Sequence, residues 1–293
     1  MTKNSAKAKE VLRYLSLIGI CLVFSSSLGF AQATQPVVPE HAFTIAPSVF
    51  HFLYEEPSID IQVDGDMYGI MGSYTYHKKA LLSTSIEYAQ GDLKYDGFLQ
   101  EIGDGEDDGS SQARVPFQGD TEDWILEWRA LLGLDFPIGK CLLTPFSGVG
   151  YRYWNNQGEG TGFYEREITY WYSPIGLALF GAFSPRWTFG ISGEYDFLWS
   201  AKTETDLSDV LYGLPRVHLS AEQGGGYGLR GSLWIKAQLA RHFALSIEPF
   251  VRYWDIDESN QVPLTYFGVP TGLVVIEPAH RTTEYGLLLN LIF

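Results

Sequence analysis

The chain has 293 residues, with 35 acidic and 20 basic side chains and a formal net charge of −15 at pH 7. A chain this acidic lacks the basic patch that phosphate contacts need, which argues against nucleic-acid binding. Its 15% aromatic residues and 31 glycines are typical of a β-rich protein.

Residues 1–33 have the parts of a cleaved secretory signal peptide. The basic start carries Lys3, Lys7, Lys9 and Arg13, the apolar core covers residues 15–24, and residues 31–33 read Ala-Gln-Ala. Cys21 lies inside the apolar core and follows Ile20, where a lipoprotein signal needs a small residue. Once Cys21 is removed with the signal, Cys141 has no second cysteine to pair with. We therefore expect an exported chain with one mature domain at residues 34–293.

No apolar run long enough for a spanning helix follows residue 33, so a closed barrel is the remaining way to cross a bilayer. Ten stretches of alternating apolar and polar residues predict β-strands. They cover residues 42–55, 66–76, 81–91, 123–136, 143–154, 164–182, 187–201, 225–239, 243–256 and 281–293. The sixth is the least clear, because Pro174 lies in its middle.

The predicted connections fall into two classes. Those after the second, fourth, sixth and eighth strands are tight and each carries a base, whereas the others are longer and polar, the longest at residues 92–122. A soluble β-sandwich can also have ten strands, but it does not require this alternation. The sequence therefore predicts an all-β fold, a transmembrane antiparallel up-and-down β-barrel of ten strands with both termini periplasmic.

The predicted strands have one apolar and one charged face. In the fourth, Trp124, Leu126 and Trp128 share a face, while Glu127 and Arg129 share the other. A charge facing lipid at mid-depth costs about 2–4 kcal/mol, so the charged faces must line the lumen. The predicted lumen charge network comprises Glu127, Arg129, Arg152, Glu194, Asp196, Arg230, Lys236, Glu248 and Arg252, and Glu87 and Glu284 share its parity.

The chain ends in EYGLLLNLIF, an alternating strand. Its apolar face consists of Tyr285, Leu287, Leu289, Leu291 and Phe293. With the signal peptide and the strands that end in aromatic residues, this chain resembles the Gram-negative outer-membrane β-barrel proteins. The last strand is similar to the signal that the barrel-assembly machinery reads. The resemblance implies a monomer in the cell outer membrane, with lipid, lipopolysaccharide and that machinery as partners, and it leaves the activity open.

Ten strands also resemble the omptin surface proteases, which carry catalytic Asp and His residues at the outer rim. Asp123-Trp124 and SGEYDFLW are weak matches to that family. The segment SAKTETDLSDVLYG has no His near Asp206 or Asp209, and His218 and His280 lie further along the chain. Without a His–Asp pair no general base is identified, so we predict no catalytic residue. An omptin-like protease or a lipid-modifying barrel enzyme is the second alternative.

The lumen charges have two interpretations. They could tune a narrow selective pore, or they could pair and fill the lumen. Because acids and bases are both present, we favour a plugged lumen and a structural or surface-interaction role, with a narrow channel as the first alternative. Two similar segments, YRYWN at 151–155 and VRYWD at 251–255, allow the same two interpretations. Arg152 and Arg252 could clamp a ligand, but we expect them to pair with acids such as Glu127 and Glu248.

The predicted loop at 92–122 is acidic. Asp104, Glu106 and Asp108 alternate as in the opening of a calcium loop, but the twelfth position is Val115 instead of Glu, which rejects an EF-hand. A solvated loop is the favoured interpretation, and weak cation bridging to lipopolysaccharide phosphates is the alternative. We predict no metal site and no cofactor.

Overall fold

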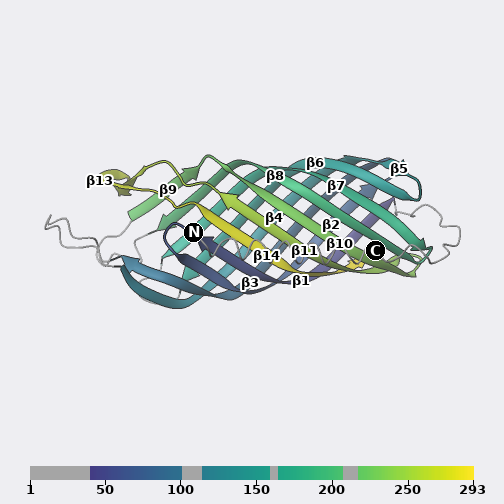
Figure 1. The fold of residues 1–293 in the computed structure, drawn as a ribbon, viewed down its shortest axis with the longest axis horizontal. Coiled ribbons are helices and arrows are strands. Elements are labelled where there is room, and N and C mark those ends of the chain that lie inside the picture. Colours follow the sequence, from purple (N-terminus) through teal and green to yellow (C-terminus); the bar gives the residue numbers. More distant parts are fainter. Residues whose placement is uncertain (1–39, 101–113, 159–163, 207–216) are drawn as a thin grey trace, which may run out of the picture. The chain divides into compact units, whose positions relative to one another are not determined.

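A computed structural model describes residues 40–100, 114–158, 164–206 and 217–293 (Figure 1). The predicted signal peptide lies outside these residues. The strands are β1 (His41–Glu56), β2 (Ile61–His77), β3 (Ala80–Gln100), β4 (Arg114–Leu134), β5 (Phe136–Ile138), β6 (Cys141–Gly158), β7 (Glu165–Ser184), β8 (Trp187–Asp206), β9 (Val217–Gln223), β10 (Gly226–Ala240), β11 (Phe243–Ile256), β12 (Val262–Tyr266), β13 (Val269–Val275) and β14 (His280–Ile292). Ten of them close into an antiparallel barrel, which confirms the predicted fold class.

The barrel closes because β1 pairs with β2 on one side and with β14 on the other. The remaining order runs β2, β3, β4, β6, β7, β8, β10, β11 and β14. Short turns join β2 to β3, β4 to β6, β7 to β8 and β10 to β11 at the end that also holds Phe293. We call this end of the barrel the turn end and the opposite end the loop end.

Two strands extend well beyond their predicted limits. β3 continues to Gln100 and β4 begins at Arg114, so the prediction of a loop is wrong for residues 92–100 and 114–122. Leu93 and Thr121 point inward, while Lys94 and Glu122 are exposed. The strands thus keep their alternation in this part of the barrel, and their charged outward side chains fit water better than lipid.

One loop-end connection is shorter than expected. Only residues 57–60 separate β1 from β2, so the prediction of a long segment after every odd strand is wrong for the first. Asp60 adopts a φ of 60° in this connection, the left-handed region that Asp tolerates better than most residues. The β1–β2 hairpin therefore ends before β3 does, since β3 continues to Gln100 beyond its last pair with β2, Gln62–Asp96.

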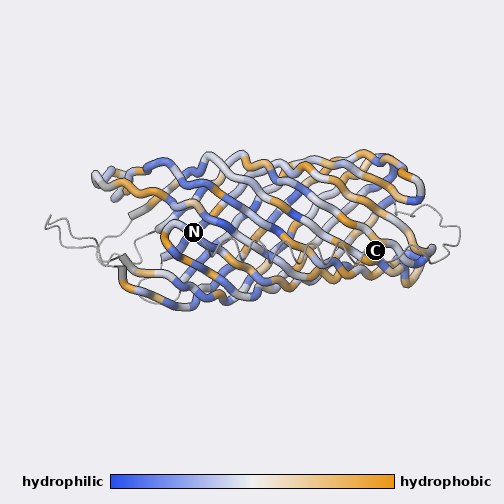
Figure 2. Tube along the Cα trace, viewed as in Figure 1, coloured by the Kyte–Doolittle hydropathy of each residue, from blue (hydrophilic) through white to orange (hydrophobic). Residues whose placement is uncertain are grey.

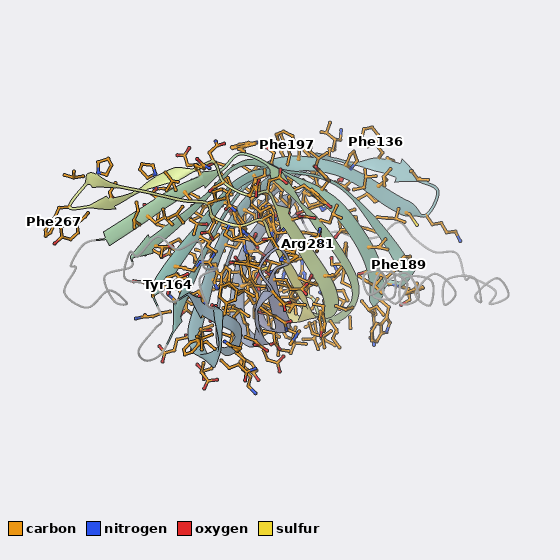
Figure 3. All side chains as sticks on the ribbon, turned by 60° about the vertical axis from the view of Figure 1, so that its left-hand side comes forward. Phe136, Tyr164, Phe189, Phe197, Phe267 and Arg281 are labelled. Atoms are coloured by element: carbon orange, nitrogen blue, oxygen red, sulfur yellow. The ribbon has the colours of Figure 1, made fainter. Side chains whose placement is uncertain are left out.

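The wall between the two ends is apolar outside. Hydropathy alternates along the strands (Figure 2), and outward side chains such as Leu132, Ile175 and Phe197 are more than half exposed. Phe136 and Phe197 both lie on the outer surface in Figure 3. An exposed apolar surface on this scale fits lipid and not water.

Aromatic rings border this apolar wall at both ends. On the loop side the ring centroids of Trp124 and Tyr153 are 4.8 Å apart, and those of Tyr195 and Tyr227 are 5.7 Å apart. On the turn side Phe243 contacts Phe293 at 5.4 Å. Paired girdles of this kind mark the two interfaces of a bilayer.

Three short strands extend the sheet at the loop end. β9 pairs with the outer part of β8, β12 pairs with β9, and β13 pairs with β12. β9 and β10 follow each other along β8. Gly226, the first residue of β10, has a φ of 138°, which side-chain-bearing residues rarely adopt. No helix in the described ranges is long and apolar enough to cross a membrane.

Candidate functional site

A network of ion pairs crosses the lumen at mid-height. It consists of five carboxylates and four guanidiniums, from Glu87, Glu127, Arg129, Arg152, Glu194, Asp196, Arg230, Arg252 and Glu284. We call this set the central ion network. All the predicted lumen charges except Lys236 and Glu248 belong to the central ion network. They meet there because strand alternation points these side chains inward.

Arg152 and Arg252 share one carboxylate, that of Glu284. Arg152 donates to one oxygen of Glu284, and Arg252 Nη1 lies 3.3 Å from the other. Arg252 Nη2 also donates to Glu87 Oε2 across the lumen at 2.6 Å. Glu284 is fully buried and Arg152 nearly so. Both oxygens of this acid are therefore neutralised, as a buried charge requires.

Arg230 holds the other half of the network. Its Nε donates to Asp196 Oδ2 at 2.7 Å, and its two terminal nitrogens donate to both oxygens of Glu127. Tyr172 also donates to Glu127, at 2.6 Å. Arg129 pairs with Glu194, whose oxygen lies 3.4 Å from Arg230 Nε. The bidentate geometry fixes the plane of the Arg230 guanidinium.

The prediction that Glu248 pairs with one of the two repeated arginines, Arg152 or Arg252, is wrong. Glu248 forms no ion pair with any described residue; it accepts a hydrogen bond from Asn290 Nδ2 at 3.0 Å. Lys236 likewise has no ion pair within the described ranges. Glu127 lies 3.9 Å from Arg252 but is held mainly by Arg230. Glu248 and Lys236 line a cavity on the turn side of the network instead.

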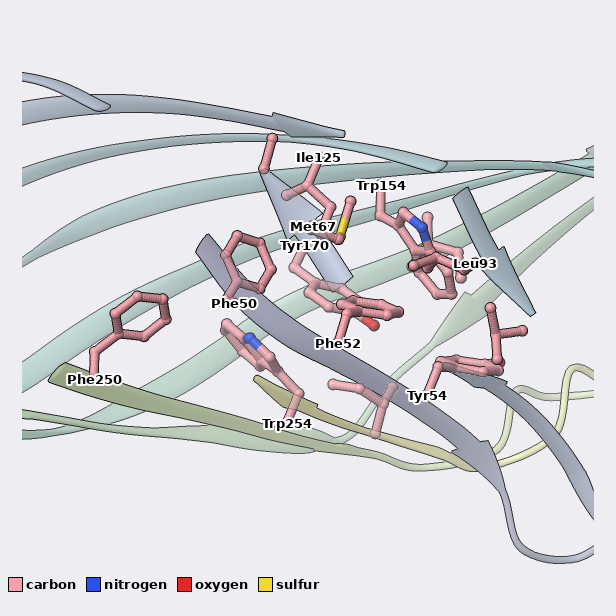
Figure 4. Close-up of a cluster of buried hydrophobic side chains, with 14 of the residues drawn as sticks. Phe50, Phe52, Tyr54, Met67, Leu93, Ile125, Trp154, Tyr170, Phe250 and Trp254 are labelled. Atoms are coloured by element: carbon pink, nitrogen blue, oxygen red, sulfur yellow. The ribbon is translucent and has the colours of Figure 1, made fainter. Parts of the chain in front are cut away.

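An aromatic layer lies on the loop side of the central ion network. Figure 4 shows the buried side chains of this layer. Its buried side chains include Phe52, Tyr54, Trp154, Tyr170 and Trp254. The ring of Trp154 lies 5.0 Å from the rings of both Phe52 and Tyr54, and that of Trp254 lies 5.1 Å from Tyr170. Trp154 and Trp254, the repeated tryptophans, thus point into the lumen and fill it.

A second ion cluster lies beyond the aromatic layer. Arg166 pairs with Glu56 at 3.0 Å, donates to Tyr54 Oη at 3.1 Å, and pairs with Glu277. Burial raises the pKa of Glu277, and the Arg166 guanidinium opposes that rise. The predicted network omitted this cluster, although the alternation of β1 and β7 would have placed Glu56 and Arg166 inward.

The histidine environments bear on the enzyme alternative. At the loop end, His280 Nε2 contacts Tyr170 Oη at 2.8 Å and no carboxylate among the described side chains. Asp123 accepts hydrogen bonds from Thr121, Trp154 and Asn156. The side chain of His218 lies outside the described residues. Among the described residues at the loop end, no histidine contacts a carboxylate.

Two His–acid contacts occur elsewhere. His77 Nε2 lies 2.8 Å from Asp135 at the turn end, and Thr144 donates to the same oxygen of Asp135 at 2.6 Å. The hydroxyl thus contacts the acid and not the histidine, which is not the order a nucleophile needs. His51 lies 3.1 Å from Asp66 on the outer wall, with Tyr285 as its other neighbour.

The remaining predicted sites give mixed outcomes. Tyr285, Leu287, Leu289 and Phe293 of the last strand are exposed on the outer wall. Asp104, Glu106 and Asp108 lie outside the described residues. Within the described ranges, no group of three or more His, Cys, Asp or Glu side chains is arranged to hold a metal ion.

Comparison with known proteins gives matches in structure alone. No family model matches the sequence, and no curated protein matches it. The structure is similar to the outer membrane protease OmpT from Escherichia coli, with a TM-score of 0.60 and 7% identity over 90% of this chain and 99% of that one.

Two further structures are more distant. The Ralstonia pickettii toluene transporter TbuX has a TM-score of 0.37 and 7% identity, covering 87% of this chain and 90% of that one. Ail, the attachment invasion locus protein of Yersinia pestis, has a TM-score of 0.32 and 9% identity, covering 87% of this chain and 100% of that one. From the likeness to OmpT and the closed barrel, this chain has the fold of the ten-stranded outer-membrane β-barrels.

Proposed function

We propose that this protein is an integral outer-membrane barrel with a closed lumen, whose role is structural or surface-interacting and is carried by its loop end. The observation that supports this most is the central ion network, which joins opposite walls through Arg152–Glu284 and Arg252–Glu87. Five carboxylates face four guanidiniums, so neither sign dominates as it does in a selective filter. The aromatic layer adds a second barrier.

The loop end offers a surface for a partner. The hairpin of β12 and β13 exposes Phe267, Val269 and Val274, each more than half accessible. β13 also lies at the end of the sheet. Exposed apolar side chains and a terminal strand are features of protein interaction sites.

Orientation and partners follow from the same proposal. The turn end and both termini face the periplasm, and the loop end faces the outside. The apolar wall contacts lipid, lipopolysaccharide surrounds the loop-side girdle, and the last strand is read by the assembly machinery of a Gram-negative cell. The barrel acts as a monomer. Protease activity, as in OmpT, is the weaker alternative, because no described His meets an acid at the loop end.

Solute flux into vesicles tests the closed lumen. Vesicles that carry the refolded protein should swell in isotonic sugar no faster than protein-free vesicles, while vesicles with an open porin swell quickly. A swelling rate that rises with the amount of this protein would favour the narrow channel. Unheated samples that migrate differently from heated ones on gels show that the barrel in the vesicles is folded.

A further inference from the structure

The turn-side half of the lumen contains a cavity of about 380 Å3. Its floor is formed by the central ion network, and a second cavity of about 350 Å3, lined by turn residues such as Arg186 and Arg241, shares Thr188, Lys236 and Ile292 with it. The cavity thus continues toward the turn end. Its volume lies within the range of small-molecule sites.

Three polar side chains lie side by side in one cross-strand row of the barrel wall, which we call the rung. Lys236 of β10 lies opposite Thr188 of β8 and Ser246 of β11. All three line the cavity. Neither the Thr188 hydroxyl nor the Ser246 hydroxyl, both buried, has a hydrogen-bond partner among the described residues, and Ser246 is only 3% exposed. Lys236 has no ion pair in the same part of the chain.

Buried polar groups normally find partners, so two buried hydroxyls without a partner among the described residues, on either side of a lysine without an ion pair there, are unusual. Two hydroxyls and one ammonium can together donate to the oxygens of one anion. The Glu248 carboxylate faces the same cavity and is held by Asn290. That fixed negative charge disfavours a ligand of high negative charge, so the rung suits a monoanion.

An apolar wall lies beside the rung. Trp234, two residues from Lys236, packs on Phe180 with ring centroids 5.3 Å apart, and both border a cluster with Phe146 and Leu81. Gly190 makes room for the indole, because a Cβ there would lie 1.9 Å from Trp234. A ligand whose anion occupies the rung therefore places its body against aromatic side chains.

We propose that this cavity binds a small monocarboxylate with an aromatic or short aliphatic body, admitted from the turn end. The carboxylate accepts from Lys236, Thr188 and Ser246, and the body packs on Trp234 and Phe180. The site needs neither transport through the barrel nor a closed lumen, so its test is independent of the flux measurement.

The test uses 4-bromobenzoate and its neutral counterpart 4-bromobenzyl alcohol. Calorimetric titration of the detergent-solubilised mature chain should give saturable binding of the carboxylate. Lys236→Met, which keeps an apolar stem, should weaken that binding by about tenfold or more and leave the alcohol unaffected. Thr188→Val and Ser246→Ala should each weaken it by about threefold. Lys140→Met, at an exposed lysine of a turn, is the matched control and should change nothing.

Tryptophan fluorescence locates the bound ligand, because bromine quenches a nearby indole. Trp234→Phe should remove the saturable part of the quenching. The proposal is overturned if the carboxylate does not saturate, or if Lys236→Met binds it as tightly as the parent. It is equally overturned if Lys236→Met destabilises the barrel and Glu248→Gln reverses the loss, since that result identifies a purely structural pair.

Discussion

Arg152 and Glu284 form a buried ion pair across the full width of the barrel. They lie 132 residues apart in the sequence, on β6 and β14. These two strands are five steps apart around the ring in either direction, so the pair joins opposite walls. The pair therefore connects parts of the barrel that share no backbone hydrogen bond.

Arg152→Met should destabilise the folded barrel. It leaves Glu284 with Arg252 alone in a confined interior, and breaking a buried pair by removing one partner costs about 3–5 kcal/mol. The Arg152→Met/Glu284→Met double variant should recover part of the lost stability, because it leaves less buried charge without a partner. Urea unfolding in lipid vesicles measures both.

Arg281→Ala is the control for this comparison. Arg281 pairs with Asp255 at 3.2 Å, but it is on the outer surface and about half exposed. An exposed pair contributes about 0–1 kcal/mol. Equal losses for Arg152→Met and Arg281→Ala would show that the lumen pair does not act as a buried contact.

Trp254→Ala should open a void in the aromatic layer. The indole is 1% exposed and packs between Tyr170 and Tyr172. Large-to-small changes at such aromatic positions cost about 3–5 kcal/mol. Trp199→Ala, at an outward position that is 54% exposed, removes a similar side chain without a void. A midpoint of unfolding that falls equally in both variants would contradict a packed lumen.

Deleting Phe293 should impair assembly in cells more than refolding in vitro. The residue makes two backbone hydrogen bonds with Phe43, at 2.8 and 3.1 Å, and one ring contact with Phe243, so the folded barrel loses little. Its proposed recognition by the assembly machinery would be lost. Phe136→Ala, at an exposed position of the same end, is the control. Equal impairment in the two settings would argue against a recognition role.

Epitope tags test the proposed orientation. A tag after Gly109, between β3 and β4 in the sequence, should be labelled on intact cells. A tag between Lys78 and Lys79, in the turn from β2 to β3, should be labelled only after the outer membrane is opened. The reverse labelling pattern would invert the orientation.

The alternation of side chains was enough to predict the fold and the faces of the strands. It placed Glu127, Arg152 and Arg252 inward and Trp124 and Phe197 outward, as the structure has them. This works because the period of a strand is two and lipid tolerates few charges. The short turns that carry basic residues marked the ends of the predicted strands, and so helped to predict ten of them.

The ion partners could not be predicted, because they depend on register and on which walls face each other. Arg252 pairs with Glu284, its neighbour on β14, and with Glu87 across the lumen. Glu248, which lies four residues from Arg252 on the same strand, contacts Asn290 instead. The acidic run at 92–122 was assigned to a loop because its charges resemble solvated residues. The described part of this run, with Asp92, Asp96, Asp120 and Glu122, instead lies on β3 and β4 with these side chains exposed on the outer wall.

The conductance of the refolded protein in a planar bilayer tests the closed lumen most directly. The account predicts no steady open level for the parent. It predicts measurable current for Arg152→Ala/Glu284→Ala/Trp254→Ala, in which one cross-lumen pair and one aromatic side chain are removed. A steady, ion-selective current through the parent, with a preference that Arg252→Ala shifts at unchanged stability, would contradict it.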